Sequence, residues 1–213
     1  MGIIRARLAG VALAAWLGAP LALSAATIPI TGTLDFVATD LGGGVYSGTA
    51  LGTQFSGSID DTTFSGEITD GNTTISFGCC IAAGGLEIFD DVTLDADTAA
   101  ILNQLSGTSQ FEAGQVYDSV NVEGDAATLG GGRIEVGVSY LLDAGAFADT
   151  SPGNYPFDPA DLRAAWFFIL EEEYDGLDIY EGLGALQSVP EPALAALLAI
   201  AALVLGGARP ISR

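Results

Sequence analysis

Short runs in which apolar and polar residues alternate constrain the fold of this chain more than any other feature. In the run 54–59, Phe55, Gly57 and Ile59 occupy alternate positions, with serines between them. The same scheme recurs nine residues later, in the run that begins at Phe64. Strict alternation over such a run is typical of a half-buried β-strand, and the Asp-rich and Gly-rich sequences between the runs favour turns. We expect strands joined as a meander near 30–37, 44–51, 54–59, 63–69 and 73–77.

Later segments repeat the pattern at greater length. Alternation is clean from Arg133 to Tyr140, and the aromatic residues that begin at Trp166 favour a buried strand. Asp158 before a proline is typical of a helix start, and Asp97 is a second candidate N-cap. Many short strands with Gly and Asp turns indicate an all-β chain with a single β-sandwich or jelly-roll-like domain. We expect the later strands near 86–94, 115–122, 133–142 and 165–171, and short helices near 97–105 and 158–164.

The N-terminus has the layout of a secretory signal peptide. Two arginines precede a largely apolar stretch at 8–23, and small residues follow it. A charged start, an apolar centre and a small-residue exit are typical of such signals. We therefore expect residues 1–26 to direct export and to be removed, and residues 27–188 to form a secreted domain.

The C-terminus carries a second targeting signal. A short proline-containing motif stands before an apolar run, and the chain ends in a basic tail. The run is short for a membrane span, which needs roughly 20 residues, and the arginines behind it would stay in the cytoplasm. This combination resembles the PEP-CTERM sorting signal. Its parts are the motif Val189, Pro190, Glu191 and Pro192, the hydrophobic helix 193–208, and the basic tail 209–213 with Arg209 and Arg213.

The resemblance covers residues 189–213 only, and it implies a route rather than an activity. Proteins with this signal are exported by Gram-negative bacteria and processed by an exosortase, a membrane transpeptidase-like enzyme. The implied partners are the exosortase and the secretion machinery, with exopolysaccharide as a further candidate. The implied location is the inner membrane in transit and then the cell surface or the extracellular matrix.

The charge balance excludes several classes of function. The chain has 27 acidic residues against 6 basic ones and no histidine, which gives a net charge of −21. Such a surface repels nucleic acid, so we expect no nucleic-acid partner, and it suits divalent cations or cationic partners. A histidine-based catalytic triad is excluded, and the commonest metal ligand is missing.

Two adjacent cysteines, Cys79 and Cys80, are the only ones in the chain. Exported proteins usually pair their cysteines, so a disulfide between these neighbours is one expectation. It would close a strained ring and kink the chain after the strand that ends near 77. Two buried thiols, or bridges between molecules, are the alternatives.

Two acidic clusters are candidate calcium sites, because carboxylate oxygens at short spacing are the ligands that calcium prefers. Neither cluster matches the twelve-residue calcium loop, and a solvated acidic surface is the alternative. We expect no other cofactor. The candidate ligands are Asp90, Asp91, Asp95 and Asp97 in the first cluster, and Glu171, Glu172, Glu173, Asp175 and Asp178 in the second.

Taken together, the sequence predicts an exported, non-enzymatic protein of the cell surface or the exopolysaccharide matrix. The alternative is a carbohydrate-binding module of the same fold, in which exposed aromatic side chains stack on sugar rings. A glycan-active hydrolase with paired carboxylates is a further alternative, with Glu135 and the glutamates of 171–173 as candidates. The candidate stacking residues are Trp166, Tyr155 and Tyr174.

Overall fold

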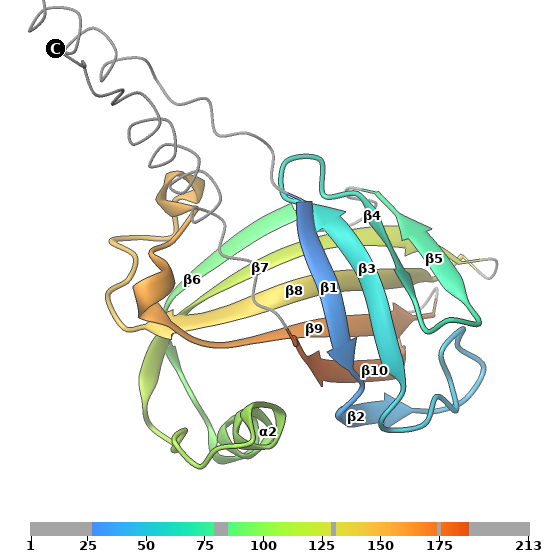
Figure 1. Cartoon of the computed structure of the whole chain (residues 1–213), viewed down its shortest axis with the longest axis horizontal. Coiled ribbons are helices and arrows are strands. Elements are labelled where there is room, and N and C mark those ends of the chain that lie inside the picture. Colours follow the sequence, from blue (N-terminus) through green and yellow to red (C-terminus); the bar gives the residue numbers. More distant parts are fainter. Residues whose placement is uncertain (1–26, 79–84, 129–130, 174–175, 188–213) are drawn as a thin grey trace, which may run out of the picture.

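Two antiparallel β-sheets make up most of the described chain (Figure 1). The computed structural model describes residues 27–78, 85–128, 131–173 and 176–187. The strands of the first half are β1 (Thr27–Thr33), β2 (Phe36–Asp40), β3 (Gln54–Asp60), β4 (Gly66–Thr69), β5 (Thr74–Phe77) and β6 (Gly85–Thr93). The remaining elements are α2 (Ala96–Ser106), β7 (Val116–Ala127), β8 (Arg133–Asp143), the 3-10 turns η1 (Pro152–Asn154) and η2 (Pro159–Asp161), β9 (Leu162–Glu172) and β10 (Asp178–Ala185).

The strands divide into a four-stranded and a six-stranded sheet, and the early strand β2 joins the late strands in the larger one. One sheet has the order β1-β3-β4-β5, and the other has the order β2-β10-β9-β8-β7-β6. In Figure 1, β1 and β3 cross in front of β8 and β9. Two isolated bridges join the sheets at their borders, one between Gly32 and Leu186 and one between Gly78 and Asp125. The all-β expectation is confirmed, in a β-sandwich-like arrangement.

The main hydrophobic core lies between the sheets. Phe55 of β3 meets Phe167 of β9 with ring centroids 5.6 Å apart, and Tyr46 packs edge-on against Phe55 at 5.4 Å. The inward-facing residues Ile30 and Val138, one from each sheet, are fully buried. Removal of apolar surface from water is the main force for folding, so the alternation in the sequence decides which face of each strand turns inward.

Helix α2 packs on the opposite face of the six-stranded sheet. Its Leu102 belongs to a second apolar cluster with Leu141 of β8, and Trp166 of β9 packs against that cluster. The carboxylate of Asp95 accepts a hydrogen bond from the Thr98 N–H at 2.7 Å and caps the helix. The helix expected near 97–105 is therefore confirmed, with Asp95 rather than Asp97 as its N-cap. In Figure 1, α2 lies beneath the end of the long strands.

The strand expected at 30–37 is two strands in different sheets, so the prediction of one continuous strand was wrong. The chain leaves β1 after Thr33 and enters β2 at Phe36. Between them Leu34 is fully buried, and the Asp35 carboxylate accepts the Ala185 N–H at 2.9 Å. The local pattern continues through this break, so it does not reveal the change of sheet.

The segment 44–51 forms turns, so the prediction of a strand there was wrong. The carboxylate of Glu171 accepts the backbone N–H groups of Val45 and Tyr46 at 2.6 and 2.7 Å. Asp40 accepts the N–H of Gly48, whose φ of +79° is left-handed. Carboxylates therefore satisfy this backbone instead of a neighbouring strand.

The strands expected near 54–59, 73–77, 86–94, 115–122, 133–142 and 165–171 are confirmed to within a few residues, apart from longer ends on β7 and β9. The strand expected at 63–69 begins only at Gly66. The Asp60 carboxylate accepts the N–H groups of Thr62 and Thr63, and Phe64 has a φ of 53°. This turn occupies the first part of the expected strand.

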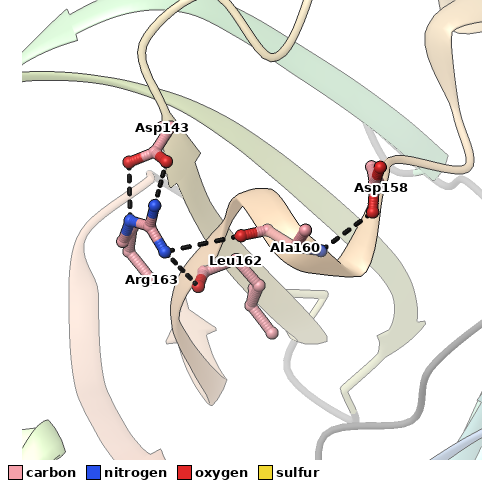
Figure 2. Close-up of polar contacts among 5 residues, drawn as sticks. All are labelled: Asp143, Asp158, Ala160, Leu162 and Arg163. Atoms are coloured by element: carbon pink, nitrogen blue, oxygen red, sulfur yellow. Dashed lines mark hydrogen bonds and ion pairs between the residues drawn. The ribbon is translucent and has the colours of Figure 1, made fainter.

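The helix expected at 158–164 is only the single 3-10 turn η2, so its predicted length was wrong (Figure 2). Asp158 caps the turn by accepting the Ala160 N–H at 2.9 Å. Leu162 already belongs to β9. Figure 2 shows Arg163 in an ion pair with Asp143 of the neighbouring strand β8. Cross-strand pairing of β9 with β8 therefore overrides the helix start.

Strand β10 has no counterpart among the expected strands. Its Gly182 and Gly184 interrupt the apolar alternation that would reveal it. Glycine is required at 184, because a Cβ there would lie 2.1 Å from the Thr33 carbonyl oxygen. Close approach of the two sheets therefore removes the signal from which a strand is recognised.

Several expectations lie outside the described residues. They are the signal peptide 1–26, the cysteines Cys79 and Cys80, Tyr174, Asp175 and the sorting signal 189–213. Among the residues that the structure describes, no helix combines the length and apolar character needed to span a membrane.

Candidate functional site

The outer face of the six-stranded sheet carries polar side chains from adjoining strands. On β7, Val120 and Val122 face the core, so Asn121 and Glu123 face outward. On β8, the same alternation turns Glu135 and Ser139 outward. The antiparallel register sets Asn121 opposite Ser139, and the Ser139 hydroxyl donates to Asn121 Oδ1 at 2.8 Å.

Helix α2 and this outer face enclose a groove of about 520 Å³. The groove combines carboxylates, an amide, hydroxyls and two aromatic rings. Such a mixture of apolar surface and a few convergent polar groups is typical of ligand sites. The lining residues are Glu87, Asn121, Glu123, Arg133, Glu135, Ser139, Trp166, Phe168, Leu170, Glu181 and Leu183 from the strands, and Thr98, Ile101, Leu102 and Leu105 from α2.

The shape of the groove depends on a glycine. A Cβ at Gly137 would lie 2.5 Å from the Phe168 ring and 2.8 Å from the Glu123 Cβ. The Phe168 ring therefore lies over Gly137 and against the side chain of Glu123. Without this glycine, the aromatic floor of the groove could not hold its position.

Glu123 is the most unusual residue of the groove. Only 4% of it is exposed, and within the described part of the chain its carboxyl group has no hydrogen bond or ion pair. Burial, together with the nearby charges of Glu135 and Glu87, raises its pKa to about 8, although Arg133 acts in the opposite direction. Glu123 is therefore mostly protonated at neutral pH.

Arg133 contributes a positive charge to the groove, and this charge already interacts with two glutamates. Its guanidinium donates two hydrogen bonds to Glu172 and forms an ion pair with Glu135 at 3.0 Å. The hydrogen bonds from Arg133 hold the pKa of Glu172 below its usual value. Burial raises the pKa of Glu135 despite Arg133. Two carboxylates thus share one guanidinium.

A separate acidic cluster joins Asp90 and Asp91 to Asp118. One carboxylate oxygen from each lies within 4.8 Å of the others, the one such group among the described residues. Asp118 is fully buried and accepts the N–H groups of Asp91 and Phe147 at 3.1 and 2.8 Å. Burial, followed by the charges of Asp91 and Asp118, raises the pKa of Asp90. Three hard oxygen donors of this kind suit calcium.

The other candidate calcium ligands that the structure describes have separate places and roles in the fold. Asp95 caps α2 and Asp97 lies in its first turn. Glu171 is buried against the backbone of 45–46, and Glu172 pairs with Arg133. The backbone N–H of Glu173 closes a turn with Leu177, and Asp178 opens β10.

The candidate stacking residues Trp166 and Tyr155 lie in different parts of the molecule. Trp166 lines the groove and is half-buried. Tyr155 packs on the main core, and its hydroxyl donates to Asp61 at 3.3 Å. In a second hollow of about 690 Å³, the carboxylates of Glu171 and Glu172 are already engaged.

Sequence reasoning singled out Trp166 and Glu135 but missed Glu123, Phe168 and Asp118. The alternation of apolar and polar residues in β7 indicates that Glu123 lies on the same outer face of the strand as Asn121. The position of α2 over that face depends on packing between distant segments, and no local pattern shows it.

Comparisons with protein-family models, with curated proteins and with solved structures find no match to this chain.

Proposed function

We propose that this chain is an exported, non-enzymatic protein of the bacterial cell surface or exopolysaccharide matrix, and that its groove binds a carbohydrate. The observation that carries the carbohydrate proposal is the pairing of Trp166 and Phe168 with polar side chains along one groove. Sugar rings present an apolar face for aromatic contact and a rim of hydroxyls for hydrogen bonds.

The groove offers both kinds of contact on rigid elements. Trp166 and Phe168 lie two residues apart on β9 and therefore share its outer face. Asn121, Ser139 and the glutamates supply hydrogen-bonding groups from the adjoining strands. Because strands hold these groups, a ligand would find them in place without ordering a loop.

Export and sorting are supported by the terminal sequences. The signal-like residues 1–26 and the motif 189–192 fit a route through the inner membrane to the surface, with an exosortase as processing partner. A domain that carries a glycan-binding groove fits an exopolysaccharide matrix. The strongly acidic composition argues against nucleic acid as a partner.

A glycoside hydrolase is a second candidate, favoured by one observation. Glu123 and Glu135 face the same groove from adjacent strands, and the pKa of Glu123 of about 8 suits a general acid. An acid that is still protonated at neutral pH can protonate a leaving oxygen.

Glycan-array binding with the full chain in non-ionic detergent tests the proposal. We expect binding without turnover, and at least about tenfold weaker binding for Trp166→Ala. Glu67→Gln, an exposed change on β4 of the other sheet, is the control. Turnover that Glu123→Gln abolishes would replace the binding proposal with the hydrolase, and silence on all glycans would remove both.

A further inference from the structure

The charges of the groove are unbalanced. Glu87, Glu135 and Glu181 line it beside Glu123, which is mostly protonated at neutral pH, whereas Arg133 is the one basic residue among the described residues that line it. Arg133 already contacts Glu135 and Glu172, so its charge is not available to an acidic ligand. An anionic or sulfated sugar would meet carboxylates with nothing to neutralise it, whereas a cationic ligand would relieve their repulsion.

The arrangement fits an organic cation better than a metal ion. The one group of three acidic residues that approach within metal-binding distance, in the described part of the chain, is the Asp118 cluster on β6 and β7. The groove glutamates are spread over four strands, with Trp166 and Phe168 among them. An ammonium group on a ring that also contacts aromatic faces uses both features.

Glu123 supplies an independent sign of a missing partner. The residue is 4% exposed, it lines the groove, and within the described chain it makes no hydrogen bond or ion pair. Buried carboxyl groups are ordinarily hydrogen-bonded, because burial without a partner costs free energy. A ligand in the groove that donates a hydrogen bond to Glu123 would give this carboxyl group a partner that the described residues do not supply.

We propose that the groove binds an amino sugar, specifically a glycan of hexosamine units whose amino groups are free and protonated, with one ammonium group donating to Glu123. This inference rests on the proposed carbohydrate-binding function and names its ligand class. Trp166 and Phe168 contact the sugar faces, and Glu135 and Glu181 add to the attraction.

Proton linkage follows from the surroundings of Glu123. The ionisable groups around it are Glu87 on β6, Asp125 on β7, and Arg133 and Glu135 on β8. The groove residues that α2 and β9 contribute are uncharged. An ammonium within hydrogen-bond distance lowers a carboxyl pKa by about 1–3 units. Binding at pH 7 therefore releases a large fraction of one proton from Glu123.

The test uses the full chain in non-ionic detergent with Trp16→Phe, which leaves Trp166 as the single tryptophan reporter. Three probes share a β-1,4 hexasaccharide backbone and differ at position 2: glucosamine, N-acetylglucosamine and glucose. Tetralysine is the fourth probe. Trp166 fluorescence gives the affinity, and calorimetry in buffers of different ionisation enthalpy gives the number of protons exchanged.

We expect the glucosamine hexamer to bind at least about tenfold tighter than either neutral hexamer. Glu123→Gln should remove most of that preference and should lower proton release relative to the parent chain. Because the ligand amine takes up the same protons in both experiments, the difference between variant and parent chain reports on Glu123 alone. Glu87→Gln should weaken the preference less, and Glu67→Gln, which removes the same charge from the other sheet, should leave it unchanged.

The outcomes separate the two proposals. Equal binding of all three hexamers would overturn the amino-sugar inference and leave carbohydrate binding in place. No binding of any hexamer would overturn both. Tetralysine binding as tight as the glucosamine hexamer would assign the groove to a basic peptide instead. A Glu123→Gln chain with an unchanged preference would remove Glu123 from the site.

Discussion

The carboxylate of Glu171 accepts the backbone N–H of Tyr46 at 2.7 Å, although the two residues lie 125 positions apart in the chain. Glu171 belongs to β9, and Tyr46 inserts its ring into the core beside Phe55. One buried side chain thus holds the turn at residues 45–46 and places an aromatic residue between the sheets.

Removing this carboxylate should loosen the turn segment. Glu171→Ala leaves the buried N–H of Tyr46 and the partly buried N–H of Val45 without an acceptor, at a cost of roughly 2–4 kcal/mol. Chemical denaturation monitored by circular dichroism measures the loss. Glu173→Gln, an exposed neighbour, is the matched control and should change stability by less than about 0.5 kcal/mol. Equal stability of the two variants would contradict the assigned role of Glu171.

A methyl group at position 137 should disturb the groove. Gly137→Ala sets a Cβ against the Phe168 ring and the Glu123 side chain, so we expect a loss of about 1–3 kcal/mol in stability and weaker glycan binding. Gly153→Ala is the control, because its added Cβ has only an ordinary contact with Ser151 at 3.6 Å. If Gly137→Ala bound glycan as the parent chain does, Phe168 would not be a groove contact.

Glu123 should make stability depend on pH. Its pKa is raised from 4.5 to about 8 in the folded chain, so the folded state holds more protons than the unfolded state between these values. Stability should therefore fall as pH rises from about 4.5 to about 8 and level off above that range. Glu123→Gln should flatten this part of the curve and stabilise the chain at pH 8 by about 2 kcal/mol or more. A curve that the substitution leaves unchanged would show that Glu123 does not titrate in this window.

Calcium should stabilise the Asp118 cluster. Three carboxylates held together repel one another, and a divalent cation relieves that repulsion. Because calcium binds only the folded arrangement, millimolar calcium should raise the melting temperature by several degrees. Asp118→Asn should abolish the rise, whereas Asp97→Asn, in the first turn of α2, should preserve it. No calcium effect on the parent chain would rule out the site.

The sorting signal has its own test in a Gram-negative host that carries an exosortase. Replacement of Pro190, Glu191 and Pro192 by alanine should leave the tail attached and the protein in the inner membrane. Mass spectrometry of the mature protein and cell fractionation report the result. A mature mass and a location that the substitution leaves unchanged would contradict processing by an exosortase and favour a plain membrane anchor.

Local sequence predicted the long strands well, because in β7, β8 and β9 one face meets the core and the other does not. It failed where distant residues replaced local pairing. Tyr46 lies in a segment with strand-like alternation, yet Glu171 takes its backbone hydrogen bond. Gly184 is needed for close approach to Thr33, and that need removes the apolar residue that would have marked β10.

The candidate groove was predictable only in part. Trp166 and Glu135 stood out by residue type, whereas Glu123 acquires its high pKa from the strands and helix packed around it. Asp118 lies 27 positions from Asp91, so spacing along the chain could not join it to the first acidic cluster.

The bridges between the sheets affect how readily the chain aggregates through the edges of its sheets. The Gly78 and Asp125 backbones exchange two hydrogen bonds, at 3.0 and 2.8 Å, and the Gln187 N–H donates to Thr31 of β1 at 2.8 Å. Unpaired backbone at a sheet border is a template on which other chains add strands and begin fibrils. Here part of that border is already occupied from within the molecule. A protein concentrated in a surface layer would in this way resist self-assembly through its strands and keep its groove free for a ligand.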